Sequence, residues 1–143
     1  MIYTPLTKKA LKLCFEAHKN QVDKTGLPYV FHPFHLAEQM QDELTTICAL
    51  LHDVIEDTDY MLIDLEEMGF PKEALEALKL LTHDENVPYM DYVAEISKNS
   101  IAKKVKIADL MHNSDMSRLD TVDDYAIKRA EKYKKALEYL KNN

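Results

Sequence analysis

Four residues in the segment LLHDVIEDT, residues 50–58, have the types and spacing for metal or acid–base chemistry. His52, Asp53, Glu56 and Asp57 lie at positions i, i+1, i+4 and i+5, so one continuous helix would place them on a face about 140° wide. A histidine among three carboxylates suffers like-charge repulsion unless a positive group lies nearby, and a divalent metal ion would supply it. The alternative interpretation is an acidic helix face exposed to water.

The neighbours of these four residues favour the metal over the exposed face. The side of the helix opposite the acids would be apolar, with Ile47, Cys48, Leu51, Val54 and Ile55. Leu50 and Ala49 stand beside the acids, where a water-exposed face would carry Lys, Gln or Ser. We therefore expect this helix to be buried on most of its sides.

A second candidate ligand, His32, follows a stretch without helical or strand periodicity. Residues 20–31 contain a glycine and a proline and are expected to form a loop. Pro33 suits the first turn of a helix, where its missing N–H is not needed. This pattern places His32 just before the helix start, held by a proline and a packed loop. His35, one turn further on, is expected at the surface or behind the ligands.

The third stretch, residues 101–116, has apolar residues nearly all round the helix axis, so we expect much of it to be buried. Asp109 lies in its middle, and a buried carboxylate costs several kcal/mol unless it is paired or coordinates a cation. Lys106, His112 and Asn113 share its helix face. A structural pair with Lys106 or His112 is therefore the alternative to a metal ligand.

Composition predicts a single all-α domain spanning residues 1–143. Apolar residues make up 46% of the chain, which contains only two glycines and no tryptophan. We expect a compact bundle of about seven to eight helices. Their expected ranges are about 5–20, 33–42, 45–57, 61–68, 71–83, 88–96, 101–116 and 122–140. Thr45 or Thr46 should open the third of these helices, Pro88 should begin the sixth, and Ser100 should cap the seventh. The apolar residues of the last helix are expected to face inward, namely Ala126, Ile127, Ala130, Tyr133, Leu137 and Leu140.

Charge and hydropathy restrict the partners and the compartment. The formal net charge of −7 argues against binding of nucleic acid polymers or anionic membranes, although a metal and local cations would still allow a phosphorylated small molecule. No segment approaches the ~20 apolar residues of a membrane span, and the first ten residues do not look like a secretory leader. Cys14 and Cys48 fit reduced core thiols. These features favour a cytoplasmic protein and leave its oligomeric state open.

Taken together, His32, His52, Asp53 and Asp109 form a mixed set of two imidazoles and two carboxylates. Such a set suits Mn²⁺, Fe²⁺, Co²⁺ or Zn²⁺, with positions left for water and substrate. No Ser or Cys nucleophile arrangement and no glycine-rich phosphate loop competes with it. Lys24, Lys106 and Arg118 are the candidate cations for a phosphate, and one or two basic residues of 122–140 are further candidates.

Three motifs in this order resemble a known family. GLPYVFHP, ALLHDVIEDT and VKIADLMHN are similar to the hydrolase domain of the RelA/SpoT-type alarmone enzymes and their small stand-alone relatives, within the HD superfamily of metal-dependent phosphohydrolases. The resemblance runs from about Ala10 to Asn113. It implies a compact all-α fold of the HD-domain type and removal of pyrophosphate from the 3′ position of ppGpp, the nucleotide of the stringent response.

The resemblance also implies residue roles. It assigns one Mn²⁺ to His32, His52, Asp53 and Asp109, assistance of water attack to Glu56 and Asp57, a ribose contact to Asn113 and a substrate contact to Lys24. Lys106 and Arg118 are added on position and charge alone.

Differences from the family pattern keep two other functions open. Asp23 stands where the alarmone hydrolases typically have an arginine that stacks on guanine, and SDMSRLD follows Asn113 where a shorter turn is usual. The sequence also ends at Asn143, before helices that help to enclose the nucleotide in most of these hydrolases. These differences favour an HD phosphohydrolase or phosphodiesterase for another nucleotide. The third hypothesis is a catalytically inactive module that binds a nucleotide or a protein, and the retained Glu56 and Asp57 argue against it.

Overall fold

The computed structural model describes residues 1–143, and its regular secondary structure is helical. The all-α prediction is confirmed. The helices are α1 (Pro5–His18), α2 (Phe31–Glu38), α3 (Glu43–Leu51), α4 (Val54–Asp57), α5 (Leu62–Glu67), α6 (Lys72–Leu81), α7 (Tyr89–Ser97), α8 (Ser100–Asn113), the 3-10 helix η1 (Met116–Arg118) and α9 (Asp124–Asn142).

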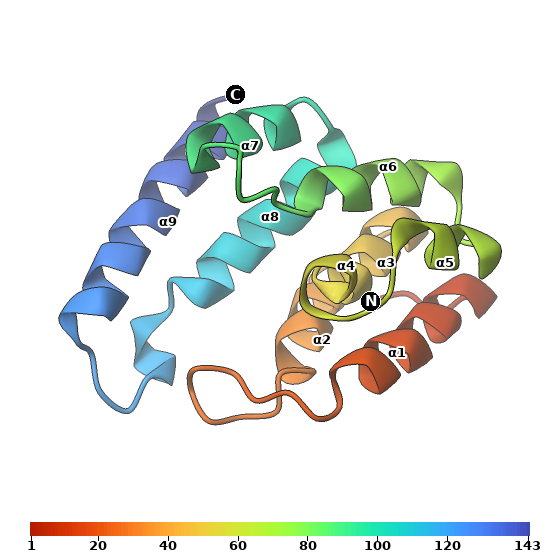
Figure 1. The fold of residues 1–143 in the computed structure, drawn as a ribbon, viewed down its shortest axis with the longest axis horizontal. Coiled ribbons are helices and arrows are strands. Elements are labelled where there is room, and N and C mark those ends of the chain that lie inside the picture. The colour runs from red at the N-terminus through yellow and green to blue at the C-terminus, as the bar shows by residue number, and fades with distance from the viewer.

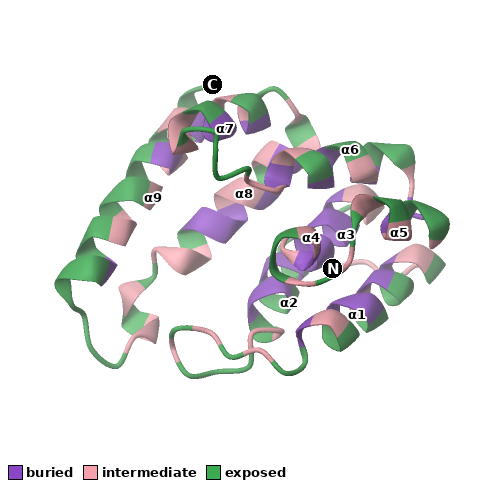
Figure 2. Cartoon of the chain, viewed as in Figure 1, coloured by how far each residue is buried: buried purple, intermediate pink, exposed green.

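Two helices, α3 and α8, form the centre of the bundle. α3 packs against α1, α2, α6 and α8, and α8 also packs against α7 and α9. Figure 1 shows α8 crossing the molecule between α9 on one side and the group α1–α6 on the other. Seven of the nine residues of α3 are buried, and Figure 2 shows buried residues gathered on α3 and the middle of α8. Because one cluster of 27 buried apolar residues includes residues of both helices, side chains on them are held rigidly.

The expected continuous helix over 45–57 is wrong, because the chain leaves the helix at His52 and Asp53. α3 ends at Leu51, and α4 is a separate single turn that starts at Val54. Asp53 has φ −108° and ψ 1°, which turns the chain away from the axis of α3. The expected count of seven to eight helices therefore becomes eight plus this extra turn. His52 and Asp53 therefore do not share one continuous helix face with Glu56 and Asp57.

Several expected helix ends also shift. Asp42, not Thr45 or Thr46, caps α3, since its side chain accepts from the Thr45 N–H at 2.8 Å. Asn99, not Ser100, caps α8, with its side chain accepting from Ala102 N–H at 2.9 Å. Each helix start has more than one short polar side chain near it, and the backbone of the loop before the helix decides which of them caps.

Other boundaries differ in ways that matter for the site. α2 begins at Phe31, so His32 lies in its first turn and not before it. α8 ends at Asn113 instead of continuing to Met116, and η1 follows. Ile127, expected to face inward, is 43% exposed, whereas Ala126 in the same turn of α9 is buried. Gly69 has φ +91° and ends α5 as predicted.

None of the helices combines the length and the low polarity that crossing a membrane would require.

Candidate metal centre and adjoining cavities

The structure brings the four candidate ligands together from three elements. His32 comes from the first turn of α2, His52 and Asp53 from the break after α3, and Asp109 from the middle of α8. The His32 Nε2 atom lies 2.9 Å from Asp109 Oδ1. The His52 Nε2 atom lies 3.1 Å from Asp53 Oδ2 and 3.4 Å from Asp109 Oδ1. Ligand atoms of His32, His52 and Asp109 all fall within 4.8 Å of one another, which suits a single cation.

His52 is oriented to offer a lone pair to this cluster. Its Nδ1 atom lies 2.8 Å from the carbonyl oxygen of Ala49, and because a carbonyl can only accept, Nδ1 carries the proton. The Nε2 atom is buried without a hydrogen-bond partner, although two carboxylates lie close to it. An unpartnered, buried acceptor between carboxylate oxygens is expected where a cation binds.

The charges around His52 also favour a cation at this place. Burial by itself disfavours a charged imidazole, but the neighbouring Asp53 and Asp109 raise the pKa of His52 well above its ordinary value. The two carboxylates therefore attract positive charge to this point. A proton or a divalent metal ion can provide it, and the donor set matches a borderline metal.

Asp109 forms the structural pair with Lys106 and also faces the other candidate ligands. Its Oδ2 atom accepts from Lys106 Nζ at 2.9 Å, which is the structural pair. Its Oδ1 atom faces His32 and also accepts from Asn113 Nδ2 at 3.0 Å. Burial opposes ionisation of Asp109, but the attraction of Lys106 holds its pKa well below the ordinary value. Lys106 thus keeps Asp109 ionised while one carboxylate oxygen remains directed at the cluster.

Because Asp109 is only 5% exposed, we expect the change Lys106→Met to lower the free energy of unfolding of the metal-free protein by about 3 kcal/mol. The change leaves a buried carboxylate without its cation. Urea denaturation measures it. Lys104→Met, at an exposed position of the same helix, is the matched control and should shift stability by less than about 0.5 kcal/mol. Equal losses in the two variants would contradict a stabilising pair.

His112 contacts the candidate ligand His32, whereas its sequence position suggested only a partner for Asp109. Its Nδ1 atom lies 2.7 Å from Nδ1 of His32, and the two rings stack with centroids 5.0 Å apart. Burial, together with the charges of Arg118 and His32, lowers the pKa of His112 to about 4. His112 is therefore neutral at pH 7, and its Nδ1 atom can accept a hydrogen bond from His32. His35 is exposed, as expected, and its ring contacts His112.

Tyr29 is a second neighbour that the sequence analysis did not single out. Its hydroxyl donates to Asp53 Oδ2 from the loop before α2. Burial and the charge of Asp53 raise the pKa of Tyr29 far above its ordinary value, so the phenol stays protonated and remains a donor. The only sequence signal was its place in the motif GLPYVFHP, within a segment expected to be a loop.

Glu56 and Asp57 lie on α4, one turn beyond Asp53. The backbone N–H of His83 donates to Glu56 Oε1 at 2.7 Å, which holds this side chain in place. Burial, followed by the charges of Asp53 and Glu56, raises the pKa of Asp57 to about 6. Burial also raises the pKa of Glu56. Both acids are therefore better proton acceptors than ordinary carboxylates.

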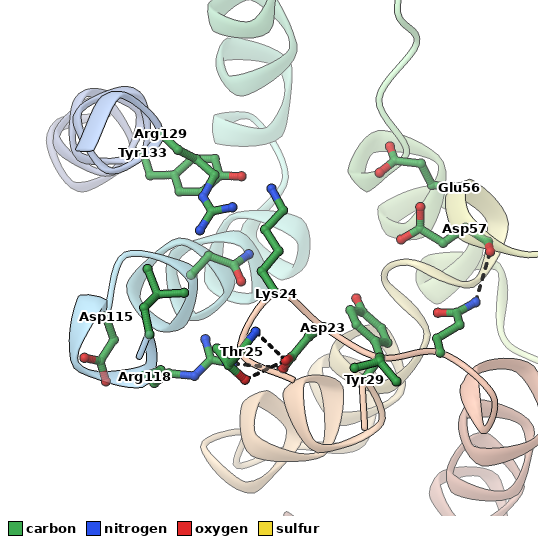
Figure 3. Close-up of a pocket in the computed structure, with 14 residues that line it drawn as sticks. Asp23, Lys24, Thr25, Tyr29, Glu56, Asp57, Asp115, Arg118, Arg129 and Tyr133 are labelled. Carbon is green, nitrogen blue, oxygen red and sulfur yellow. Dashed lines mark hydrogen bonds and ion pairs between the residues drawn. The ribbon is translucent and has the colours of Figure 1, made fainter. Parts of the chain in front are cut away.

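Two adjoining cavities meet at these acids. The outer cavity, of about 690 Å³, is lined by the loop 21–25, Tyr29, α4, the end of α8, η1 and α9. The inner cavity, of about 250 Å³, is lined by the candidate ligands Asp53 and Asp109 and reaches Lys106 and Lys132. Glu56, Asp57, Asn113 and Tyr133 border both. Figure 3 shows Glu56 and Asp57 across the outer cavity from Arg129 and Tyr133.

The candidate substrate residues occupy different positions around these cavities. Lys24 and Arg118 line the outer cavity, and Asn113 lies between the two. Lys24 Nζ lies 3.3 Å from the Tyr125 hydroxyl and forms no ion pair, whereas Lys106 forms an ion pair with Asp109. The basic face of α9 contributes Arg129 to the outer cavity and Lys132 to the inner one.

Comparison with known proteins gives relatives that are named guanosine-3′,5′-bis(diphosphate) 3′-pyrophosphohydrolase and others that are named GTP pyrophosphokinase. No family model matches the chain. It is 32% identical over 132 residues to a guanosine-3′,5′-bis(diphosphate) 3′-pyrophosphohydrolase of Aquifex aeolicus, covering 90% of this chain and 19% of that protein. It is 28% identical over 144 residues to the enzyme of that name, MESH1, from Danio rerio, covering 91% of this chain and 79% of MESH1. The chain is a homologue of the ppGpp 3′-pyrophosphohydrolases.

Further likenesses agree with this relationship. The bifunctional (p)ppGpp synthase/hydrolase SpoT of Escherichia coli is 32% identical over 121 residues, which cover 74% of this chain and 17% of SpoT. The chain therefore spans about a fifth of the two bacterial relatives but most of MESH1. A solved structure described as a metazoan ortholog of SpoT superposes with a TM-score of 0.79 at 22% identity, covering 98% of this chain and 87% of that one. This alarmone-hydrolase homologue thus shares their fold.

Proposed function

We propose that the chain is a metal-dependent phosphohydrolase that converts ppGpp to GDP and pyrophosphate. The observation that carries the proposal is the convergence of His32, His52, Asp53 and Asp109. Two of these residues, Asp53 and Asp109, line the inner cavity, and Glu56 and Asp57 lie where that cavity meets the outer one. The names of the relatives supply the substrate. An outer cavity of about 690 Å³ is within the usual size range of small-molecule sites.

The four converging residues would hold one divalent ion, for which we propose Mn²⁺ over Fe²⁺, Co²⁺ or Zn²⁺. The unpartnered Nε2 atom of His52 supports a metal at this place. If Nε2 of His32 also binds metal, its Nδ1–H donates to Nδ1 of His112, which the low pKa of His112 permits. When bound, the ion would polarise a phosphoryl oxygen and make the attacking water more acidic.

The chain's own residues would supply the remaining steps. Asp57 or Glu56 takes the proton of the attacking water, since both border the inner cavity and have raised pKa values. The water oxygen bonds to the phosphorus next to the ribose 3′ oxygen, the bond between that phosphorus and the 3′ oxygen breaks, and the 3′ oxygen takes up a proton and leaves as the hydroxyl of GDP. Lys132, on the wall of the inner cavity, offers positive charge to the pyrophosphate group under attack, and Lys24 offers it to phosphates in the outer cavity. Asn113, which borders both cavities, would contact the ribose, and Lys106 would act through Asp109.

We expect His112→Ala to weaken Mn²⁺ binding by about 10- to 100-fold, because His32 then loses the acceptor that fixes its ring. His112→Asn should retain most of the affinity, since its amide oxygen can accept at the position of Nδ1. Titration of the protein with Mn²⁺, followed by electron paramagnetic resonance, measures both. His35→Ala removes a ring that contacts His112 without touching a ligand, and should leave affinity unchanged. Unchanged binding in His112→Ala would contradict this role.

A second candidate function is hydrolysis of another nucleotide. Asp23 favours it, because this carboxylate lines the outer cavity and is held in an ion pair with Arg118. The experiment that decides is incubation of the protein with Mn²⁺ and either ppGpp or a panel of nucleotides, with the products separated by ion exchange. GDP and pyrophosphate, formed only with metal, would support the first function. Intact ppGpp beside cleavage of another nucleotide would support the second.

We propose the cytoplasm as the compartment of the enzyme, and a small nucleotide as its partner. The two cysteines, Cys14 and Cys48, are buried free thiols, which fits a reducing environment.

A further inference from the structure

An ion pair joins two segments that are 95 residues apart on the wall of the outer cavity. The Arg118 Nη2 atom lies 3.3 Å from Asp23 Oδ2, and Arg118 Nη1 donates to the carbonyl oxygen of His112 at 2.9 Å. Both side chains line the cavity, at 21% and 12% exposure. The guanidinium is thus held along its edge by two acceptors from different elements. Figure 3 shows the two side chains on the wall of the cavity formed by the loop and η1.

Asp23 is itself fixed by its loop. Its Oδ1 atom accepts from the Thr25 N–H at 2.8 Å, from the Thr25 hydroxyl at 2.5 Å and from the Leu27 N–H at 3.1 Å. Burial disfavours its charge, but these hydrogen bonds hold the pKa of Asp23 below the ordinary value. Asp23 therefore remains ionised, with Oδ2 available for Arg118.

This pairing changes what Arg118 can offer to a ligand. A guanidinium neutralised by a carboxylate attracts a phosphate weakly, but its planar face can still stack on an aromatic ring. The cations of the outer cavity without a carboxylate partner are Lys24 and Arg129. The outer cavity thus has unpaired positive charges, Lys24 and Arg129, near α9. It also has a fixed planar group, the guanidinium of Arg118, between the loop 21–25 and η1.

We propose that Arg118 recognises the nucleobase of the bound nucleotide by stacking, and that Asp23 is the residue that positions it. The inference rests on the proposed function for the presence of a nucleotide and specifies which residues distinguish the base. Arg118 contacts the ligand, whereas Asp23 acts through Arg118.

The test compares ligands with and without a base. We would measure, by calorimetry on the metal-free protein, the binding of GDP and of ribose 5-diphosphate, which carries the same phosphates without the base. Base stacking contributes about 1–3 kcal/mol, so GDP should bind the wild type at least about fivefold more tightly through the base. Arg118→Ala should remove this preference. Arg118→Lys should remove it too, because lysine keeps the charge and loses the plane.

Two further variants separate stacking from charge. Asp23→Asn should keep acceptance by the loop and lose the ion pair, and should reduce the preference for GDP by several-fold. Arg129→Ala, the control, should weaken both ligands to a similar extent. A preference for GDP that survives in both Arg118 variants would overturn the inference. Failure of the wild type to cleave ppGpp would count against the proposed function alone, because the binding comparison does not depend on turnover.

Discussion

The change Asp53→Ala is expected to lower kcat/KM for ppGpp by about 10³-fold or more, which corresponds to roughly 4 kcal/mol of transition-state stabilisation. Asp53 Oδ2 faces the Nε2 atom of His52 and accepts from the Tyr29 hydroxyl. Removing this carboxylate takes away a proposed ligand and one of the two charges that attract a cation to His52. Steady-state release of pyrophosphate with saturating Mn²⁺ measures the loss.

Asp59→Ala provides the matched control for this variant. Asp59 is exposed, lies just beyond α4 and does not border the inner cavity. It should retain activity within about twofold, and both variants should keep the helical circular dichroism of the wild type. Activity of Asp53→Ala close to that of Asp59→Ala would contradict the role assigned to Asp53.

The second large effect is expected at the acids of α4. Asp57→Asn and Glu56→Gln should each lower kcat by about 10²- to 10⁴-fold if that acid takes the proton of the attacking water. Unlike Asp53→Ala, they should leave Mn²⁺ binding nearly unchanged, because neither acid is among the proposed ligands. The acid whose replacement has the larger effect is the base. Near-normal kcat in both variants would contradict proton transfer by α4.

The pH dependence of kcat also tests proton transfer by an acid of α4. The base must be ionised to accept a proton, so activity should fall as the pH decreases through its pKa. Burial and the charges of Asp53 and Glu56 place the pKa of Asp57 at about 6 without metal. A bound cation lowers the pKa, so we expect the acidic decline of kcat at or below about pH 6. It should disappear from the residual activity of Asp57→Asn if Asp57 is the base.

The sequence predicted most of the architecture because helix periodicity and proline and glycine positions are local signals. Gly69 and the start of α7 after Pro88 fell at the expected places. The division of 45–57 into α3 and α4 was not predictable from periodicity, because both halves carry apolar residues at helical spacing. The break depends on the geometry around His52 and Asp53, which tertiary contacts decide.

The residue types of the candidate site were predictable from the sequence, but the contacts between its side chains and their neighbours were not. The pattern of His32, His52, Asp53 and Asp109 suggested a metal because those side chains are unfavourable when buried without one. The contact of His112 with His32 spans 80 residues, and the pair of Arg118 with Asp23 spans 95. No local pattern encodes such contacts. Asp23, read only as a missing arginine, is in fact the group that holds an arginine from η1.

The most direct test of the account is a titration of the metal-stripped protein with Mn²⁺ in which ppGpp hydrolysis and metal binding are measured together. The account predicts no GDP without metal, a rise in activity in proportion to bound Mn²⁺, and a plateau when the His32–His52–Asp53–Asp109 site is filled with one ion per chain. Hydrolysis that does not depend on metal, or ppGpp left intact at full occupancy, would contradict it.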